Sequence, residues 1–511
     1  MFLSSRVGSL IEPLAGRRWD RDDVSAEVAR RVVAYARLGM RDGDNVFLHH
    51  GNRLEFFADL CAVWLLGGCV VPIDARLTTF EMENLARTAQ PKFSIWHEPL
   101  EEVLRDRLSG FGVHLVRSGA VADGHDSDDP PAESSLSLDS PALILFTSGT
   151  TGDPKGVVHT HRSLRARWMS LRQSLGVTKF RRTLCVLPTH FGHGLICNCL
   201  FPWLSGCDLY ILPPFRTDVV LELGRVLDEH EITFMSSVPS LWRLAIRTAR
   251  RPRRGTLERV FCGSAPLSAS MWKNIQEWTG TDEVWNAYGI TETGSWVAGT
   301  SIGDFSPADG LVGEPWGAVV KVLRSDATRP TPPLNEECAP GEAGFVWLNT
   351  PALMQGYFRR DDLTRLVVSQ GWFMTGDIGF LDDHGHLYLR GRVRDEINKG
   401  GMKVFPGDID AVLETAGGVT DVCSFGYDGD PLYGENIAVA LVMADASEDG
   451  LRDVYRYVAE RLASHQMPAR WYLVAEIPRT SRGKVNRSKV AQSCEGVIQI
   501  DWRKVLEERR G

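Results

Sequence analysis

FTSGTTGDPKGVVHTH, residues 146–161, is the stretch around which the chain is organised. It follows an apolar run at residues 142–145 that is typical of a buried strand. Glycines let backbone N–H groups approach an anion, and the hydroxyl side chains and Lys155 add donors and a positive charge. The stretch therefore predicts a phosphate-binding loop. It is not the P-loop of nucleoside triphosphatases, because Pro154 replaces the second glycine before the lysine.

The composition is that of a globular protein with at least two domains. The chain has 511 residues, 43% hydrophobic and 24% charged, which is more than one hydrophobic core accommodates. Its net charge of −8 is spread along the chain and argues against nucleic-acid binding. The basic run at residues 247–254 is interpreted as a solvated helix end and loop, with a phosphate-rich ligand as the alternative.

The cysteines and the N-terminal segment point to a cytoplasmic protein. Ten cysteines are scattered without a CxxC pair or zinc-ligand spacing, so we interpret them as reduced core residues. The first residues lack a charged leader followed by a continuous apolar core. The longest apolar stretch, residues 60–73, is too short to span a bilayer. We therefore expect no integral membrane association.

Helix and strand patterns alternate in the first part of the chain. A helical pattern begins after Asp22 or Asp23, which we expect to cap it, and stops at Gly39. Three elements follow: a strand at 45–49, a buried helix at 54–66 and a strand at 69–73. Such alternation predicts a parallel sheet. The Asp-, Ser- and Pro-rich segment 118–140 is predicted to be an exposed loop.

Strand-like runs that each end in a turn rich in Pro, Gly, Ser or Thr dominate the middle of the chain. They occupy residues 183–187, 208–212, 232–235, 259–262 and 283–286. Amphipathic helical patterns separate several of them, the first joining Val219, Leu223 and Val226. This is the pattern of a doubly wound sheet, which binds ligands outside the carboxyl ends of its strands. We therefore expect the turns to share one crevice with the loop 146–161.

Six motifs resemble, in order and spacing, those of the adenylate-forming superfamily, which contains acyl-CoA synthetases, luciferases and peptide-synthetase adenylation domains. They are the loop 146–161, GSAPL (263–267), YGITE (288–292), GWFMTGD (371–377), GRVR (391–394) and RTSRGKVNR (479–487). The chain is closest in character to an acyl-CoA synthetase. The resemblance implies an α/β fold: a large N-terminal domain (1–393) of doubly wound, mainly parallel sheets with flanking helices, plus a small mobile α+β C-terminal domain (394–511).

The resemblance implies an AMP-forming acid–thiol ligase that uses ATP, Mg²⁺ and coenzyme A. A carboxylate is a poor electrophile, so ATP converts it to an acyl-AMP with release of pyrophosphate, and the thiol of coenzyme A then attacks. This chemistry needs no side-chain nucleophile, and positioning and charge stabilisation suffice. One alternative is a ligase that loads the phosphopantetheine of an acyl carrier protein. The other is a nucleotide-binding protein without catalysis.

The nucleotide site follows from the resemblance residue by residue. Glu292 corresponds to the magnesium ligand, since hard divalent ions prefer oxygen, and Thr291 contacts the α-phosphate. Asp377 accepts from the ribose hydroxyls, and Arg392 reaches the ribose and phosphates. The other ATP- and AMP-binding residues are Thr147, Ser148, Gly149, Thr150, Thr151, Lys155, Ser264, Ala265, Tyr288 and Gly289. The Tyr288 ring is expected to stack on the adenine, with a plain core aromatic as the alternative.

The segment after Arg392 resembles the mobile domain of the family, with strands expected at 421–425 and 437–443 and a helix at 451–462. Lys484 corresponds to the catalytic lysine that bridges the carboxylate and the α-phosphate. Arg394 stands at the hinge, where the family usually has Lys or Asp. Gly400 and Gly401 would leave room for the pantetheine arm of coenzyme A.

The acyl pocket is expected, by the same resemblance, to be lined by His190, Phe191, His193, Val238 and Asn286. Adenylation domains for α-amino acids carry an aspartate in the segment that corresponds to PTHFGHGL, residues 188–195, and this chain has none there. An uncharged apolar or aromatic acid is therefore favoured as substrate. For His190 a hydrogen-bonded packing histidine is the alternative.

Overall fold

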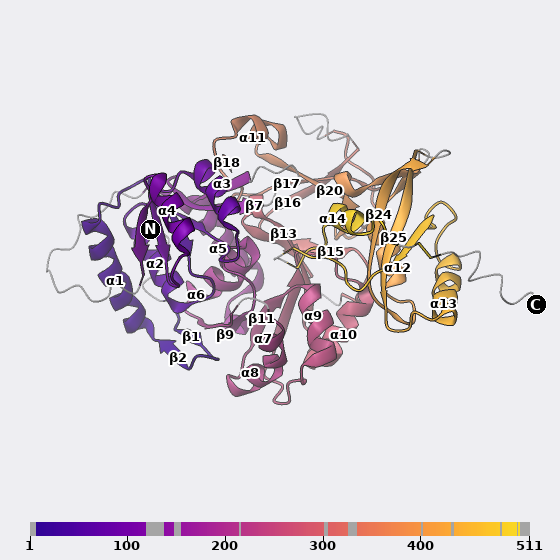
Figure 1. The fold of residues 1–511 in the computed structure, drawn as a ribbon, viewed down its shortest axis with the longest axis horizontal. Coiled ribbons are helices and arrows are strands. Elements are labelled where there is room, and N and C mark those ends of the chain that lie inside the picture. The colour runs from indigo at the N-terminus through magenta and orange to yellow at the C-terminus, as the bar shows by residue number, and fades with distance from the viewer. Residues whose placement is uncertain are drawn as a thin grey trace, which may run out of the picture.

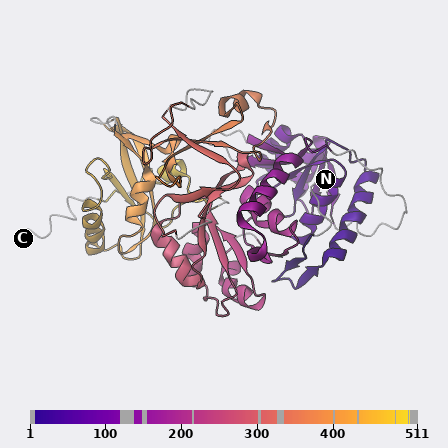
Figure 2. The same cartoon turned by 180° about the vertical axis from the view of Figure 1, so that it is seen from behind.

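Three sheets succeed one another along the molecule. The computed structural model describes residues 7–118, 137–147, 155–213, 216–300, 305–324, 335–399, 402–430, 434–480, 483–497 and 499–500. Views from opposite sides both place the third sheet, drawn in orange and yellow, at the end of the molecule away from the indigo N-terminal elements (Figures 1 and 2). Within the described ranges, no helix has the length and apolar character needed to cross a membrane.

The largest sheet has a parallel half and an antiparallel half. The parallel half contains, in spatial order, β13 (Val284–Ile290), β12 (Arg259–Gly263), β11 (Phe234–Ser237), β9 (Arg182–Cys185), β10 (Asp208–Ile211) and β1 (Leu10–Glu12), edged by antiparallel β2 (Arg17–Trp19). The antiparallel half continues from β13 through β14 (Ser295–Gly299), β15 (Leu311–Pro315), β21 (Leu387–Arg392), β20 (Trp372–Leu381), β17 (Gly344–Asn349) and β16 (Val319–Leu323), with β19 (Val368–Ser369) beside β20. The turns after β9, β11, β12 and β13 therefore meet at one edge.

The second sheet contains both ends of the stretch 146–161, which was predicted to be a loop. Its order is β18 (Gly356–Tyr357), β8 (Lys155–Thr160), β7 (Pro141–Thr147), β4 (Cys69–Pro72), β3 (Asn45–His49), β5 (Phe93–Trp96) and β6 (His114–Arg117). Strands β7 and β8 are antiparallel and pair up to Thr147 opposite Lys155, so the two ends of the loop are held together. Residues 148–154 between them lie outside the described residues. Most of the predicted loop 118–140 also lies outside them.

Helices cover both large sheets. Between the sheets and around their edges lie α1 (Arg21–Arg37), α2 (Leu54–Leu65), α5 (His161–Leu175), the π-helix η3 (His193–Leu200) and α6 (Phe201–Trp203). The outer face of the parallel half carries α7 (Thr217–Leu221), α8 (Leu223–Glu229), α9 (Pro239–Thr248) and α10 (Ala269–Thr279). Helices α3 (Thr79–Ala89) and α4 (Glu102–Gly110) cover the second sheet, and α11 (Asp361–Val367) packs beside β18. The α/β architecture with large parallel and mixed sheets and flanking helices is confirmed.

Two local predictions were wrong. Asp20, not Asp22 or Asp23, caps α1, because its carboxylate accepts the backbone N–H groups of Asp22 and Asp23 at 2.9 and 3.0 Å. Asp23 completes the cap by accepting the Asp20 N–H. The helix expected through Val219 and Val226 is two helices, α7 and α8, which meet at Glu222. The apolar side chains of both still pack in one core.

The third sheet is small and mostly antiparallel. Its strands are β23 (Met402–Val404), β22 (Ile397–Lys399), β25 (Gly434–Met443) and β24 (Val419–Asp430), with β26 (Arg470–Leu473) parallel to β25. Helices α12 (Pro406–Leu413) and α13 (Glu448–Ala459) share one core with it, and α14 (Arg487–Ser493) contributes to another. The expected strands at 421–425 and 437–443 fall within β24 and β25. This unit is the separate α+β C-terminal domain.

Candidate active site

The turn after β13 carries the YGITE motif. Strand β13 has an irregular register between Tyr288 and Gly289, where β14 comes very close: a Cβ on Gly289 would lie 2.1 Å from the Ser295 carbonyl oxygen. Only glycine permits that approach. The chain then enters the short turn η4 (Thr291–Thr293), which presents Thr291 and Glu292 at the edge of the sheet.

Asp377 is held by two predicted neighbours. Its Oδ2 accepts the Tyr288 hydroxyl, and its Oδ1 lies 2.8 Å from Arg392 Nε, because β20 and β21 pair Asp377 opposite Arg392. The negative charge of Asp377 raises the pKa of Arg392. A carboxylate has about four lone-pair positions, so Asp377 can accept further hydrogen bonds. Residues from three distant motifs, YGITE, GWFMTGD and GRVR, thus meet at one carboxylate.

Glu292 and Lys155 meet around a tyrosine that sequence reasoning missed. The Tyr357 hydroxyl donates to Glu292 Oε1 at 2.8 Å, and Lys155 Nζ lies 5.8 Å from the centroid of the same ring. Burial raises the pKa of Tyr357, so the hydroxyl keeps its proton and donates. Tyr357 comes from β18, a strand of two residues that pairs with β8. A strand this short gives no periodic signal in the sequence.

A divalent cation fits this carboxylate in the way magnesium is usually bound. The described residues include no cluster of three His, Cys, Asp or Glu side chains that could hold a metal ion by itself. Magnesium commonly binds one or two carboxylates together with substrate phosphates and water. Glu292, which bonds Tyr357 through one oxygen, can supply such a carboxylate beside Lys155.

Two buried side chains support the η4 turn from behind. His159 Nε2 donates to the Thr291 carbonyl oxygen at 2.7 Å, and burial lowers the pKa of His159 to about 4, which keeps it neutral. Arg167 donates to the Thr293 carbonyl oxygen at 2.9 and 3.2 Å and to that of Trp316 at 2.8 Å. Burial also lowers the pKa of Arg167, to about 10.

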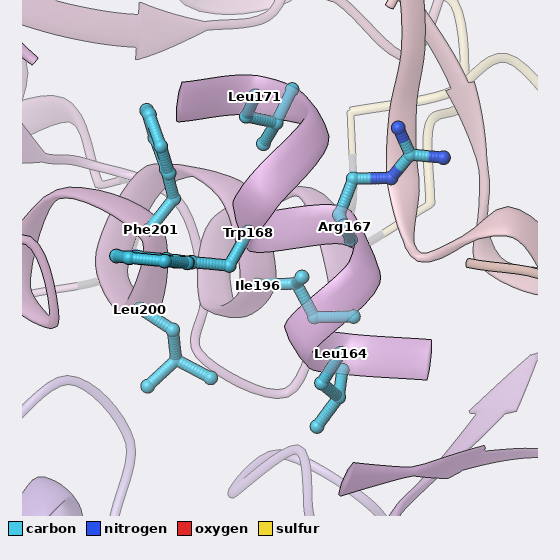
Figure 3. Close-up of a pocket in the computed structure, with 7 residues that line it drawn as sticks. All are labelled: Leu164, Arg167, Trp168, Leu171, Ile196, Leu200 and Phe201. Carbon is cyan, nitrogen blue, oxygen red and sulfur yellow. The ribbon is translucent and has the colours of Figure 1, made fainter. Parts of the chain in front are cut away.

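Arg167 also borders a small apolar pocket between α5 and the π-helix. Figure 3 shows its guanidinium directed away from the apolar side chains that form the rest of the lining: Leu164, Trp168, Leu171, Ile196, Leu200 and Phe201. The pocket is therefore part of the hydrophobic core, and the guanidinium group forms hydrogen bonds with the η4 turn. A lone arginine on the apolar face between Leu164 and Leu171 was the available sequence signal.

His193 joins two of the turns expected to line the crevice. It begins the π-helix η3, and its ring nitrogens lie 2.7 Å from Ser264 Oγ and 2.6 Å from Ser236 Oγ. Burial and then the positive charge of Lys484 lower the pKa of His193 to about 3. The imidazole is therefore neutral, and one nitrogen donates while the other accepts. The Phe191 ring lies 5.9 Å from it.

The other predicted pocket residues have separate partners and belong to different elements. His190 Nε2 is 3.4 Å from Asp74 Oδ2. The Asn286 amide donates to the Leu311 carbonyl oxygen at 2.6 Å and so links β13 to β15. Val238 caps the N-terminus of α9. Ala265 follows Ser264 in the turn after β12, whose last residue, Gly263, could not carry a Cβ because Ala287 O would be 2.1 Å away.

Lys484 reaches this site from the C-terminal domain. Its Nζ lies 6.0 Å from the centroid of the Phe191 ring. The turn that carries it is closed by hydrogen bonds from Thr480 N to Lys484 O and from Gly483 N to Thr480 O, both 2.8 Å. Arg394 lies in the turn η5 (Val393–Asp395) with 58% of its side chain exposed. Gly400 and Gly401, like Ser148, Gly149, Thr150 and Thr151, lie outside the described residues.

The arrangement joins the β7–β8 hairpin, a carboxylate with spare acceptor capacity, a second carboxylate and a lysine from the C-terminal domain. Thr147 ends β7 at the base of the hairpin, and Lys155 begins β8. Tyr288, Asp377 and Arg392 form one group, and Glu292, Tyr357 and Lys155 form the neighbouring one. Lys484, Phe191 and His193 form a third group on the side of the π-helix. Such a site can bind a nucleotide and stabilise negative charge at its edge.

Comparisons with known proteins agree with this geometry. The chain is 30% identical to a 2-succinylbenzoate–CoA ligase of Bacillus licheniformis over 89% of this chain and 90% of that protein. It is 29% identical to a long-chain-fatty-acid–CoA ligase of Mycobacterium tuberculosis over 97% of each chain. The crystal structure of ATP-bound MatB from Rhodopseudomonas palustris has the same fold, with a TM-score of 0.84 and 23% identity over 96% of this chain and 97% of that one.

The family assignment rests on two matched domains. The family described as AMP-binding enzyme matches residues 15–358, and its C-terminal domain matches residues 408–484. Together these ranges contain most of both units seen in the structure. The chain therefore belongs to the AMP-binding enzyme family, and the adenylate-forming resemblance predicted from its motifs is confirmed.

Proposed function

We propose that the protein is an AMP-forming acid–thiol ligase, which activates a carboxylic acid as its acyl-AMP and transfers the acyl group to coenzyme A. The observation that carries the proposal is the meeting of Lys484, from the C-terminal domain, with the residues at the edge of the large sheet. Relatives named as CoA ligases along nearly the whole chain support it. An enzyme that needs ATP and coenzyme A would work in the cytoplasm.

The nucleotide is bound, in this proposal, by the two neighbouring carboxylates. Asp377 accepts the ribose hydroxyls with its remaining lone pairs while Arg392 and Tyr288 fix its orientation. The Tyr288 ring faces the adenine, beside Gly289, Ser264 and Ala265. The hairpin loop, with Thr147, Lys155 and the residues between them, holds the β- and γ-phosphates. Glu292 would hold Mg²⁺, which neutralises phosphate charge, and Thr291 would contact the α-phosphate.

Lys484 does the electrostatic work of the first half-reaction. A cation between the acid carboxylate and the α-phosphate stabilises the charge that develops as the carboxylate attacks. In this step a carboxylate oxygen forms a bond to the α-phosphorus. The bond from the α-phosphorus to the bridging oxygen of the β-phosphate breaks, and pyrophosphate leaves. In the second half-reaction the thiol of coenzyme A attacks the acyl carbon and AMP leaves, so no enzyme nucleophile is required.

The acid is proposed to be uncharged apart from its carboxylate. His193 is neutral and both its ring nitrogens already bond serine hydroxyls, so it offers no charge to a second carboxylate or an ammonium group. The Phe191 ring supplies an apolar wall beside it. Val238, Asn286 and His190 complete the proposed pocket. An apolar or aromatic acid suits these walls better than an α-amino acid, which needs an anion for its ammonium group.

The domain boundary is proposed at residues 393–394, with Arg394 as hinge. The third sheet begins just beyond this point, and Arg394 is largely exposed, so it can remain solvated while the backbone rotates. One orientation brings Lys484 to the nucleotide. A second orientation would withdraw it and bring Gly400 and Gly401 to the entry path of the pantetheine arm.

A half-reaction assay tests the proposal. Purified enzyme is incubated with MgATP and a panel of acids that includes benzoate, coumarate, octanoate, malonate and 2-succinylbenzoate, and pyrophosphate release is measured. Coenzyme A and a holo acyl carrier protein are then offered separately, and thioester is detected by mass. We expect acid-dependent pyrophosphate release and acyl-CoA. Thioester on the carrier protein alone would favour the carrier-loading alternative, and failure of every acid to release pyrophosphate would favour the non-catalytic one.

A further inference from the structure

We propose that Arg243, on helix α9, is a positioning residue for adenylation, which holds the C-terminal domain in the orientation that brings Lys484 to the active site. This inference rests on the proposed function, because it concerns the half-reaction that needs Lys484. Arg243 belongs neither to the proposed nucleotide site nor to the proposed acyl pocket. It acts through an ion-pair network that leads across the domain boundary to the Lys484 loop.

The first step of the network crosses between the domains. Arg243 lies in α9 (Pro239–Thr248) of the large domain, and its Nη2 pairs with Glu414, the residue directly after α12. Its Nε lies 3.8 Å from Asp421 Oδ1 in β24. Both carboxylates belong to the C-terminal domain. One guanidinium therefore fastens two elements of the small domain to one helix of the large domain.

The second step leads from Asp421 to the lysine. Both oxygens of Asp421 accept Arg479 Nη2, at 2.7 and 2.8 Å. Arg479 also pairs with Val485 in an antiparallel bridge, and these two residues flank the turn from Thr480 to Lys484. The position of the lysine turn is thus tied to Asp421, which Arg243 holds from the other domain.

Helix α9 also contacts the lysine turn directly. A Cβ on Gly483 would lie 2.3 Å from Ser240 Oγ and 3.4 Å from Val238 Cγ2, so this glycine sits against the first turn of α9. Ser240 and Arg243 are three residues apart and share one face of the helix. We call Val238, Ser240 and Arg243 the docking strip. The strip receives Gly483 at one end and the two carboxylates at the other.

The burial of the network makes its contribution larger than that of a surface ion pair. The side chains of Arg243, Glu414, Asp421 and Arg479 are 20, 21, 18 and 18% exposed. Burial also raises the pKa of Glu414, which indicates a desolvated contact. A partly buried ion pair contributes more than a pair on the surface, because solvent screens it less, and less than a fully buried pair.

When the small domain rotates, only the ion pairs made by Arg243 have to break. Glu414, Asp421 and Arg479 all lie in the C-terminal domain and keep their mutual arrangement, so Arg479 continues to neutralise Asp421. Arg243 remains with the large domain. Its contacts therefore belong to the docked orientation alone, and their loss should slow the half-reaction that uses this orientation and spare the other.

The test compares Arg243→Ala with Arg247→Ala, which removes an exposed arginine one turn later on the same helix. Pyrophosphate release is measured with MgATP and the acid of the panel that drives it fastest. Thioester formation is measured separately from the synthetic acyl adenylate of that acid and coenzyme A. For Arg243→Ala we expect adenylation to fall about tenfold or more, equivalent to about 1.4 kcal/mol, with thioester formation within about twofold of wild type. Arg247→Ala should match wild type in both.

A charge exchange and a physical measurement separate positioning from general stability. Arg243→Glu should be worse than Arg243→Ala, because it faces Glu414 and Asp421, and adding Glu414→Arg should restore part of the lost adenylation. Hydrogen exchange with MgATP bound should rise in the peptides that contain α9 and residues 408–421 for Arg243→Ala and stay unchanged for Arg247→Ala.

Equal loss of both half-reactions, or unchanged hydrogen exchange at both segments, would overturn the inference. Absence of pyrophosphate release by the wild type would instead overturn the proposed function. The exchange measurement would still decide whether Arg243 holds the domains together.

Discussion

Replacing Asp377 with asparagine tests the proposed nucleotide site. The carboxylate bonds Tyr288 through Oδ2 and Arg392 through Oδ1, and its remaining lone pairs are the acceptors proposed for the two ribose hydroxyls. Asparagine has the same shape but is neutral and has one acceptor oxygen. That oxygen must face Arg392, because an N–H₂ group there would oppose the guanidinium donors. The amide N–H₂ group of the asparagine then faces the ribose hydroxyls, where the carboxylate is proposed to accept hydrogen bonds.

The size of the effect follows from the hydrogen bonds lost. A bond to a charged group contributes about 1.5–3 kcal/mol, and we count one such bond lost and one weakened. ATP binding should therefore weaken by about 2–4 kcal/mol, which is about a 30- to 900-fold rise in Kd. Isothermal titration of the enzyme with MgATP, without acid or coenzyme A, measures this quantity directly.

Two controls make the result interpretable. Asp382→Asn changes a carboxylate just beyond the same strand, where Asp382 accepts the N–H groups of His384 and His386 in a turn, and it should leave ATP affinity unchanged. Tyr288→Phe keeps the ring and removes one neighbour of Asp377, so its effect should stay below about tenfold. An Asp377→Asn protein that stays folded and binds ATP within about threefold of wild type would refute the ribose assignment.

Three further changes address the lysine, the turn support and pH. Lys484→Ala should abolish most pyrophosphate release and leave thioester formation from a supplied acyl adenylate nearly intact, whereas equal loss in both assays would contradict the proposed domain rotation. Arg167→Met should lower the melting temperature markedly, since two buried carbonyl groups lose charged donors worth about 1.5–3 kcal/mol each, and an unchanged melting curve would refute this role. Burial lowers the pKa of His159 to about 4 in the folded protein, whereas the usual pKa of histidine is near 6.5. Between these two pH values His159 is protonated in the unfolded chain and neutral in the folded chain. Stability should therefore fall as pH drops from about 6.5 toward 4, and His159→Gln should flatten this dependence in melting curves; an identical slope would argue against it.

The sequence predicted the site best where local geometry restricts the residue type. Gly289 and Gly263 allow backbone approaches that any Cβ would block, and they mark the two turns that meet beside Tyr288. The βα alternation likewise predicts that the strand ends share one edge. The motifs singled out Asp377 and Arg392, and the structure adds that they lie opposite each other on paired strands.

What the sequence did not predict depends on contacts between distant residues. Tyr357 reaches Glu292 across 65 positions from a strand of two residues. Arg243 meets Glu414 across 171 positions, and neither belongs to a motif. In the residues that the structure describes, most strands of the antiparallel half of the large sheet follow one another without a helix between them, so alternation of helix and strand gave no sign of it. Such pairings are set by packing in three dimensions, which local periodicity does not record.

The docking strip has a consequence for substrate selectivity. Val238, a residue proposed to line the acyl pocket, directly precedes helix α9, and the first turn of this helix contacts Gly483, next to the proposed catalytic lysine. The start of one helix therefore borders the proposed acyl pocket on one side and contacts the turn that carries Lys484 on the other. An acid that pushes the first turn of α9 outward would bind, yet it would also displace Lys484 from its place. Poor substrates of this enzyme should then differ from good ones in kcat more than in KM.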